Sequence, residues 1–301
     1  MGKEAMRGIY TIPSTPFHEN GSIDVDGFRN IVEFCVACGA HGLVYPVNAS
    51  EYTSLSDSER FTLAKALVET AAGRIPTVIG VAATCKENAA RFATHAKDIG
   101  ASAVIAMPPY IKSKGFSDES IFSYYQAISD AAKIPVFIQN YEPPVGTNMS
   151  AAFLLKLCRE IEYVQYVKEE TVPSTLKMQK LFDDNTGECK GVFGGSGCRY
   201  IIEEYRRGTA GNMPGCHVTD VCVALWDALE SGEQEKAKQI YKDMSPLFFF
   251  ETQFTSVYKE VLKIRGIIKS AYTRNNSYCI DDTGMKYLNE VLSILKPYMK
   301  V

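Results

Sequence analysis

The sequence predicts an α/β fold, a (β/α)8 TIM barrel followed by a C-terminal helical extension. Short apolar runs alternate with helical patterns along the first three quarters of the 301 residues. Eight repeats of strand and helix imply parallel strands with right-handed crossovers, and about 250 residues is the usual size of such a barrel. An open doubly wound sheet is the competing architecture, but no G-x-G-x-x-G follows the first strand.

Eight segments have the short, apolar composition that is typical of buried strands. They are residues 8–13, 42–46, 77–81, 103–107, 136–139, 163–168, 191–193 and 209–213. Helical patterns lie between them, such as 26–38, 57–72, 86–99, 118–132 and 151–159. The second of these helices opens with a capping-box pattern, in which Ser56 and Glu59 satisfy backbone amides at the helix start.

The remaining residues predict further helices over 233–244, 255–270 and 283–296. We therefore expect a barrel over residues 1–230 and C-terminal helices over 231–301 that pack on it.

Composition excludes several classes of function. A formal net charge of -3 gives no electrostatic basis for binding nucleic acid or an anionic membrane. No apolar stretch approaches the length of a membrane span. Nine cysteines without regular spacing fit reduced thiols in a cytoplasmic protein. Cys35 and Cys38 form a lone C-x-x-C in a helical pattern, and no histidines pair at i, i+4, so we expect no metal and no cofactor.

Lys168 is the main candidate for catalysis. It ends the apolar run from Tyr163 to Val167, which predicts an amine at the end of a buried strand. Active sites of (β/α)8 barrels lie at the C-terminal ends of the strands. A buried amine in apolar surroundings becomes neutral and nucleophilic more easily, so it can form a Schiff base with a carbonyl substrate. A strand-end lysine that reaches solvent is the alternative.

Other polar residues follow the remaining strands and are expected at the same end of the barrel. The catalytic candidates beside Lys168 are Glu170, Gln139 and Tyr110. Residues expected to bind substrate through amides and small side chains are Asn48, Ala49, Ser50, Gly195, Ser196 and Asn212. Each fits a structural role when taken singly, and Glu170 also fits a solvated loop carboxylate or the partner of a nearby cation. Together they predict a pocket with one amine, one acid and several hydrogen-bond donors.

With these residues, the sequence resembles the dihydrodipicolinate synthase and N-acetylneuraminate lyase family of Schiff-base barrels. The resemblance covers nearly the whole chain. It is carried by Ser14-Thr15-Pro16-Phe17, Gly21-Ser22-Ile23-Asp24, Ser50-Glu51, Leu55-Ser56, Pro109-Tyr110 and Val167-Lys168-Glu169. It implies that Lys168 is the covalent residue, that Asn48 and Ala49 bind the carboxylate of a 2-oxo acid, and that the protein is a homotetramer.

The sequence departs from the family pattern at three places. The G-T/S-T-G-E loop appears as Val47 to Glu51 without its glycines, and Gln139 occupies the position of a proton-relaying tyrosine. Pro144 stands where the synthase has an arginine for its second substrate. The combination argues against lysine-pathway condensation. It is similar to the sugar-acid branch of the family, in particular the 2-keto-3-deoxy-L-arabonate dehydratases.

Dehydration fits the available groups. Glu170 is the candidate acid and base next to an iminium on Lys168, and Gln139 is expected to orient the hydroxyl or water. An aldolase that releases pyruvate through the same iminium, or a silent barrel that binds 2-oxo acids, are the alternatives. We expect a small 2-oxo sugar acid as substrate, no nucleic-acid or membrane partner, and a cytoplasmic homo-oligomer.

Overall fold

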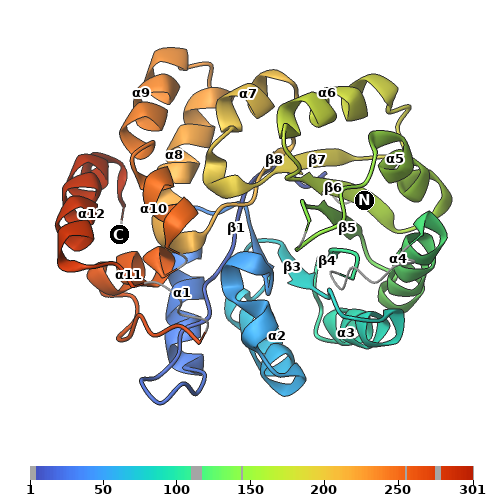
Figure 1. Cartoon of the computed structure of the whole chain (residues 1–301), viewed down its shortest axis with the longest axis horizontal. Helices are drawn as coiled ribbons and strands as arrows, with labels where there is room; N and C mark the ends of the chain where they lie inside the picture. Colours follow the sequence, from blue (N-terminus) through green and yellow to red (C-terminus); the bar gives the residue numbers. More distant parts are fainter. Residues whose placement is uncertain (1–4, 110–116, 144, 255, 275–278, 301) are drawn as a thin grey trace. The chain divides into compact units, whose positions relative to one another are not determined.

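The computed structural model describes residues 5–109, 117–143, 145–254, 256–274 and 279–300. Its eight strands are parallel and follow one another in the order β1 to β8 as a closed barrel, which confirms the predicted fold (Figure 1). The strands are β1 (Gly8–Thr11), β2 (Gly42–Tyr45), β3 (Thr77–Gly80), β4 (Ala103–Ala106), β5 (Val136–Asn140), β6 (Val164–Glu169), β7 (Gly191–Gly194) and β8 (Gly211–Asn212).

The chain forms two compact units. The first contains Met1–Arg7, Pro76–Ser196 and Tyr200–Met213, and the second contains Gly8–Ile75, Gly197–Arg199 and Pro214–Val301. The C-terminal helices thus share a unit with β1 and β2. The predicted division into a barrel over residues 1–230 and C-terminal helices over 231–301 stays a prediction.

The first unit holds strands β3 to β8 and five helices. These helices are α3 (Lys86–Asp98), α4 (Asp118–Ala132), α5 (Ala151–Glu160), α6 (Ser174–Asp184) and α7 (Ile201–Arg206). Figure 1 shows α3 to α6 following one another along the outside of β3 to β6. Serine caps begin two of them: Ser117 accepts a hydrogen bond from the Ser120 amide, and Ser150 from the Phe153 amide.

Strand register sets which side chains share a level in this unit. Gln139 on β5 lies opposite Lys168 on β6, and Lys168 lies opposite Phe193 on β7. One residue further along, Gly194 lies opposite Asn212 on β8. The predicted site residues of β5 to β8 are therefore placed at the same end of neighbouring strands.

Strand β8 is shorter than the predicted 209–213 because its flanks use their backbone groups differently. The Thr209 amide donates to the Glu204 carbonyl at 3.1 Å, at the end of α7, and not to a neighbouring strand. Pro214 has no N–H to extend a ladder. Only Gly211 and Asn212 remain in regular strand geometry.

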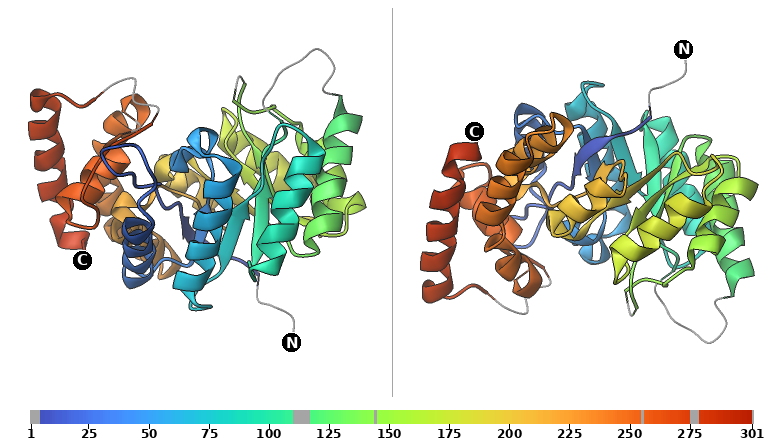
Figure 2. Two further views of the ribbon diagram at one scale, coloured as in Figure 1. Left: turned by 90° about the horizontal axis from the view of Figure 1, so that it is seen from below. Right: turned by 90° about the horizontal axis from the view of Figure 1, so that it is seen from above.

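The second unit holds β1 and β2 with helices from both ends of the chain. Its helices are α1 (Val25–Ala37), α2 (Asp57–Ala71), α8 (Thr219–Glu230), α9 (Gln234–Met244), α10 (Leu247–Gln253), α11 (Val257–Ile264) and α12 (Asp282–Leu295). Both views in Figure 2 show α12 beside the α9 to α11 helices. The predicted capping box at α2 is confirmed, because Ser56 N donates to Glu59 Oε2 at 2.9 Å and Glu59 N donates to Ser56 Oγ at 3.3 Å.

The predicted helix over 255–270 is wrong in its length, since α11 ends at Ile264. Gly266 has φ +74 and its amide donates to the Lys263 carbonyl, while the Ile267 amide donates to the Leu262 carbonyl. This pair of hydrogen bonds is a Schellman motif, which terminates a helix through a left-handed glycine. The helix α10, which follows Pro246, was not predicted because its aromatic run lacks a helical polar pattern.

Within the part of the chain that the structure describes, no helix has both the length and the hydropathy needed to cross a membrane.

Candidate active site

Lys168, Glu170 and Gln139 meet at the C-terminal ends of β5 and β6. The Lys168 Nζ atom lies 3.0 Å from Glu170 Oε2, and Gln139 Nε2 donates to the same oxygen at 2.7 Å. Alternate residues of a strand face the same side, so Glu170 returns to the face of Lys168. The lysine and glutamate side chains are 3% and 7% exposed. The predicted amine, acid and amide are thus brought together out of solvent.

An aromatic layer lies one step below this group. Phe137 and Tyr166 precede Gln139 and Lys168 by two residues and so share their face. Their rings stack at 4.5 Å between centroids, and the Phe193 ring meets Phe137 edge-on at 5.5 Å. Packed aromatic rings therefore lie on the same strand face as Lys168.

The loop after β7 closes on the carboxylate of Glu170. The Ser196 amide donates to Glu170 Oε1 at 3.2 Å. Ser196 has φ +53, an uncommon left-handed conformation for a residue with a side chain. A Cβ atom on Gly195 would overlap Glu170 Oε1, so glycine is required for this approach. The loop that was predicted to bind substrate holds the second oxygen of the acid.

These contacts define what the group can do chemically. An amine beside a buried carboxylate can pass its proton across 3.0 Å and then attack a carbonyl carbon. The same carboxylate can then move a proton at the neighbouring carbon. Among the described residues, the acid is held by Lys168, Gln139 and the Ser196 amide.

Glu169 faces the opposite side of β6 and has a different task. Its carboxylate accepts from Asn140 Nδ2 at 2.8 Å and from the Thr171 amide at 2.8 Å. Asn140 in turn exchanges hydrogen bonds with the backbone of Met149. Burial raises the pKa of the Glu169 carboxyl, while its donors act in the opposite direction. This residue ties β6 to the loop after β5.

Glu204 was missed by the sequence analysis. It lies on α7, is 1% exposed, and its Oε2 atom accepts from Asn212 Nδ2 at 2.9 Å. Burial raises its pKa to about 8, and the charges of Glu170 and Glu169 add to the shift. The only signal in the sequence is its i+3 spacing from Ile201, which places both on the buried face of α7.

Asn212 is fully buried, and its amide nitrogen is also 3.2 Å from the Gly195 carbonyl oxygen. Both contacts are to protein atoms of the loop and of α7. A direct contact with substrate stays a prediction.

The predicted carboxylate-binding turn, Asn48–Ser50, lies in the second unit as a single 3-10 turn. The Ser50 hydroxyl donates to the Pro13 carbonyl at 2.9 Å, and the Thr15 hydroxyl donates to the Ser50 carbonyl at 2.6 Å. Ser50 is completely buried, whereas Asn48 and Ala49 are partly exposed. Ser50 therefore shapes the turn, and Asn48 and Ala49 remain the candidates for contact with a ligand.

The residue after this turn is fixed by a charge cluster. Glu51 adopts φ 56 and forms an ion pair with the buried Lys259. The Arg274 amide donates to Glu51 Oε2 at 3.2 Å. Lys259 Nζ and the Arg274 guanidinium lie 4.3 and 4.4 Å from the centre of the Phe17 ring. Burial lowers the pKa of Lys259, and the Glu51 carboxylate opposes that shift.

Two residues of the sequence analysis, Tyr110 and Pro144, lie outside the described residues, so their roles stay predictions.

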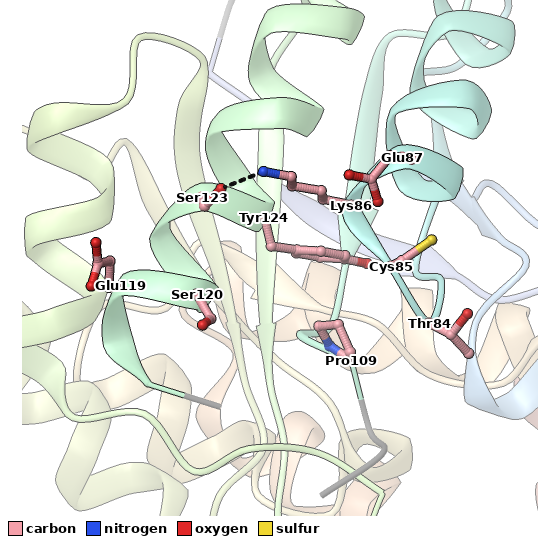
Figure 3. Close-up of a pocket in the computed structure, with 9 residues that line it drawn as sticks. All are labelled: Thr84, Cys85, Lys86, Glu87, Pro109, Glu119, Ser120, Ser123 and Tyr124. Carbon is pink, nitrogen blue, oxygen red and sulfur yellow. Dashed lines mark hydrogen bonds between the residues drawn. The ribbon is translucent and has the colours of Figure 1, made fainter. Parts of the chain in front are cut away.

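A surface pocket of about 450 Å³ lies where α3 and α4 begin (Figure 3). Lys86 reaches across it to Ser123, with Nζ and Oγ 3.1 Å apart. Most of its lining is exposed, and none of the lining residues belongs to the group around Lys168. They are Thr84, Cys85, Lys86, Glu87, Pro109, Glu119, Ser120, Ser123 and Tyr124. The pocket is therefore separate from the buried group at the ends of β5 and β6.

Comparison with known proteins identifies a family and agrees with the barrel fold. The model of the dihydrodipicolinate synthetase family matches residues 5–295. The chain belongs to the dihydrodipicolinate synthetase family. An L-2-keto-3-deoxyarabonate dehydratase of Azospirillum brasilense is 30% identical over 272 residues, which are 89% of this chain and 88% of that protein. A 4-hydroxy-tetrahydrodipicolinate synthase of Bartonella bacilliformis is 29% identical, over 80% of this chain and 81% of the other.

A solved structure gives the same result for the family fold. Dihydrodipicolinate synthase from Rhodopseudomonas palustris superposes with a TM-score of 0.87 at 25% identity, covering 96% of this chain and 97% of that one. The predicted resemblance is confirmed, and the protein is an enzyme of the lyase class of this family.

Proposed function

We propose that the protein dehydrates a 2-keto-3-deoxy sugar acid, most directly 2-keto-3-deoxy-L-arabonate, through a Schiff base on Lys168. The main support for this proposal is the buried Glu170 carboxylate, which lies 3.0 Å from the Lys168 amine and accepts a hydrogen bond from the Gln139 amide. The similarity to an L-2-keto-3-deoxyarabonate dehydratase supports the choice of substrate.

The first stage forms the iminium. Lys168 passes a proton to Glu170, and the neutral amine adds to the C2 ketone of the substrate. Glu170 returns the proton to the resulting C2 hydroxyl, which leaves as water when the C2–O bond breaks. The positive iminium nitrogen withdraws electrons from C2 and acidifies the protons on C3.

The second stage eliminates the C4 hydroxyl. Glu170 removes a C3 proton, and the electron pair of that C–H bond enters the enamine. The enamine expels the C4 hydroxyl, which takes the proton from Glu170 and leaves as water. This leaves an iminium conjugated with a C3=C4 double bond. Loss of a proton from C5 and addition of a proton at C3 move the double bond to C4=C5, which makes the C5 hydroxyl an enol. Tautomerisation of the enol to the aldehyde and hydrolysis of the imine, which takes up one water, release a 2-oxo acid semialdehyde with a net loss of one water.

Gln139 serves this reaction by orientation. A carboxamide has donors and an acceptor but does not titrate, so it cannot relay protons as a phenol does. Proton transfer therefore rests on Glu170. Carboxylate binding by Asn48 and Ala49, a contribution of Tyr110, and a homo-oligomeric assembly are parts of the same proposal, carried by the resemblance to the family.

Product analysis tests the proposal. Purified protein is incubated with 2-keto-3-deoxy-L-arabonate and, separately, with its C4 epimer, and the products are identified by NMR and mass spectrometry. Lys168→Ala is the control for uncatalysed loss. A product lighter by one water supports the dehydratase. Pyruvate with glycolaldehyde in equal amounts identifies an aldolase, and unchanged substrate identifies a silent binding protein.

A further inference from the structure

Glu204 is a buried acid that the proposed reaction leaves without a role. It is 1% exposed, and its Oε2 atom accepts from Asn212 Nδ2 at 2.9 Å. Its Oε1 atom has no hydrogen-bond partner among the described residues. Burying a carboxyl group with one unpaired oxygen costs free energy of folding, so we expect its neighbours to explain why it is present.

Those neighbours connect Glu204 to Glu170 through one peptide group. Asn212 Nδ2 also donates to the Gly195 carbonyl oxygen at 3.2 Å. The amide of the same peptide belongs to Ser196 and donates to Glu170 Oε1 at 3.2 Å. The carbonyl of the Gly195–Ser196 peptide is thus held by Asn212 on β8, whose amide also donates to Glu204 on α7. The N–H of the same peptide holds the carboxylate of Glu170.

Two glycines make this arrangement possible. A Cβ atom on Gly194 would overlap the Glu204 carboxylate, and one on Gly195 would overlap the Glu170 carboxylate. The loop therefore passes between two acids that approach its backbone from either side. Larger residues at either position would separate the peptide from one of its partners.

We propose that Glu204 is a positioning residue: together with Asn212 it fixes the Gly195–Ser196 peptide so that its N–H holds the carboxylate of Glu170 at the reacting carbon. This inference rests on the proposed acid–base role of Glu170. It does not depend on whether the reaction is a dehydration or an aldol cleavage.

Glu204 can fill this role as the neutral acid. Burial raises its pKa to about 8, so it carries its proton at neutral pH while Oε2 accepts from Asn212. A neutral acid adds no second negative charge next to Glu170. Glutamine has the same shape, one acceptor oxygen and donors in place of the acid proton. Leucine fills a similar volume and accepts no hydrogen bond.

The test measures exchange of the pyruvate methyl protons in deuterated water by NMR. Pyruvate has no C4, so exchange reports only iminium formation and proton transfer at C3. Trapping by borohydride at saturating pyruvate, read by mass spectrometry, measures iminium formation separately. The variants are Glu204→Leu, Glu204→Gln and Asn212→Leu. Glu203→Leu on the same helix, where the side chain is 53% exposed, is the matched control.

We expect Glu204→Leu and Asn212→Leu to slow exchange by about 10- to 100-fold, the value of a hydrogen bond to a charged group, with trapping retained. The double variant should be no slower than the slower single one, because both changes break the same bridge. Glu204→Gln should restore most of the exchange. If the Glu204→Leu protein does not fold, Asn212→Leu still tests the inference, because it breaks the same bridge from β8.

Several results would overturn the inference. Exchange at the wild-type rate in Glu204→Leu would show that the bridge does not act on Glu170. Glu204→Gln as slow as Glu204→Leu would require an ionised Glu204. Equal loss of trapping and exchange would reduce the residue to a structural one. A wild-type protein that is trapped but exchanges no deuterium would remove the acid–base role on which the inference rests. Exchange on pyruvate without turnover of any sugar acid would contradict the proposed function. The effect of the Glu204 variants on exchange would still decide the inference.

Discussion

Gln139 Nε2 donates to Glu170 Oε2 at 2.7 Å, and the same oxygen lies 3.0 Å from Lys168 Nζ. One carboxylate oxygen therefore serves both the amine and the amide. The amide stands at the position where the sequence resemblance places a tyrosine. Because a carboxamide does not titrate and cannot relay protons as a phenol does, the proposed mechanism assigns proton transfer to Glu170.

Glu170→Gln should block turnover of the sugar acid by about 10²- to 10⁴-fold, the usual contribution of a positioned acid or base. The iminium should still form at equilibrium with saturating pyruvate, because Lys168 is unchanged, although the loss of its proton acceptor slows the approach to that equilibrium. Steady-state kinetics measure the first effect and borohydride trapping the second. Glu203→Gln, at an exposed site, is the control. Full activity of Glu170→Gln would remove the residue from the mechanism.

Gln139→Leu should lower turnover by about 10- to 100-fold, because Glu170 loses a donor to its charged oxygen. The loss should fall on kcat, since the amide is proposed to act on the departing group. Gln126→Leu, on the exposed side of α4, controls for the loss of an amide elsewhere. A rise in KM alone would instead indicate a role in binding.

Gly195→Ala should impair catalysis without unfolding the protein. The added Cβ atom displaces the end of the Glu170 side chain, which can rotate away. Gly187→Ala is the matched control, because Gly187 has φ +113 with nothing within 4 Å of an added Cβ. It should lower the melting temperature and leave kcat per folded molecule unchanged. Equal activity of the two variants would contradict the approach of the loop to Glu170.

Glu204 should make stability depend on pH. Its pKa is about 8 in the folded protein, through burial first and then the Glu170 and Glu169 charges, against 4.5 for the ordinary carboxyl. The native state thus binds the extra proton between these values. Its stabilising contribution is complete below pH 4.5 and is lost as pH rises toward 8.

Glu204→Gln removes that titration. Relative to this variant, the wild type should lose up to about 1.4 kcal/mol of unfolding free energy per pH unit across this range. Urea unfolding at several pH values measures the difference. A difference that does not change with pH would show that Glu204 titrates normally.

Period and register explain why the centre of the site was predictable. An apolar run that ends at Lys168 gives the strand end, and a period of two returns Glu170 to the same face. Gln139 ends the preceding strand, and parallel pairing then sets it opposite Lys168. Only the parallel pairing of two consecutive strands has to be known for these three residues to converge.

Other residues depend on tertiary contacts that a local pattern does not contain. Glutamate is usually exposed, so Glu204 looks like a surface residue of α7 until Asn212 is seen to meet it. The structural contacts of Ser50 with Pro13 and Thr15 were likewise not contained in the local sequence, and its role in substrate binding stays a prediction. The end of α11 was misplaced because Gly266 acts through its left-handed backbone.

The central claim is that Lys168 is the covalent residue, and reductive trapping tests it most directly. The protein is treated with pyruvate and borohydride, digested, and mapped by mass spectrometry. The account predicts one irreversible adduct, the reduced pyruvyl group on Lys168, and none on the buried amine of Lys259. No adduct, or an adduct on another lysine with Lys168 unmodified, would contradict it.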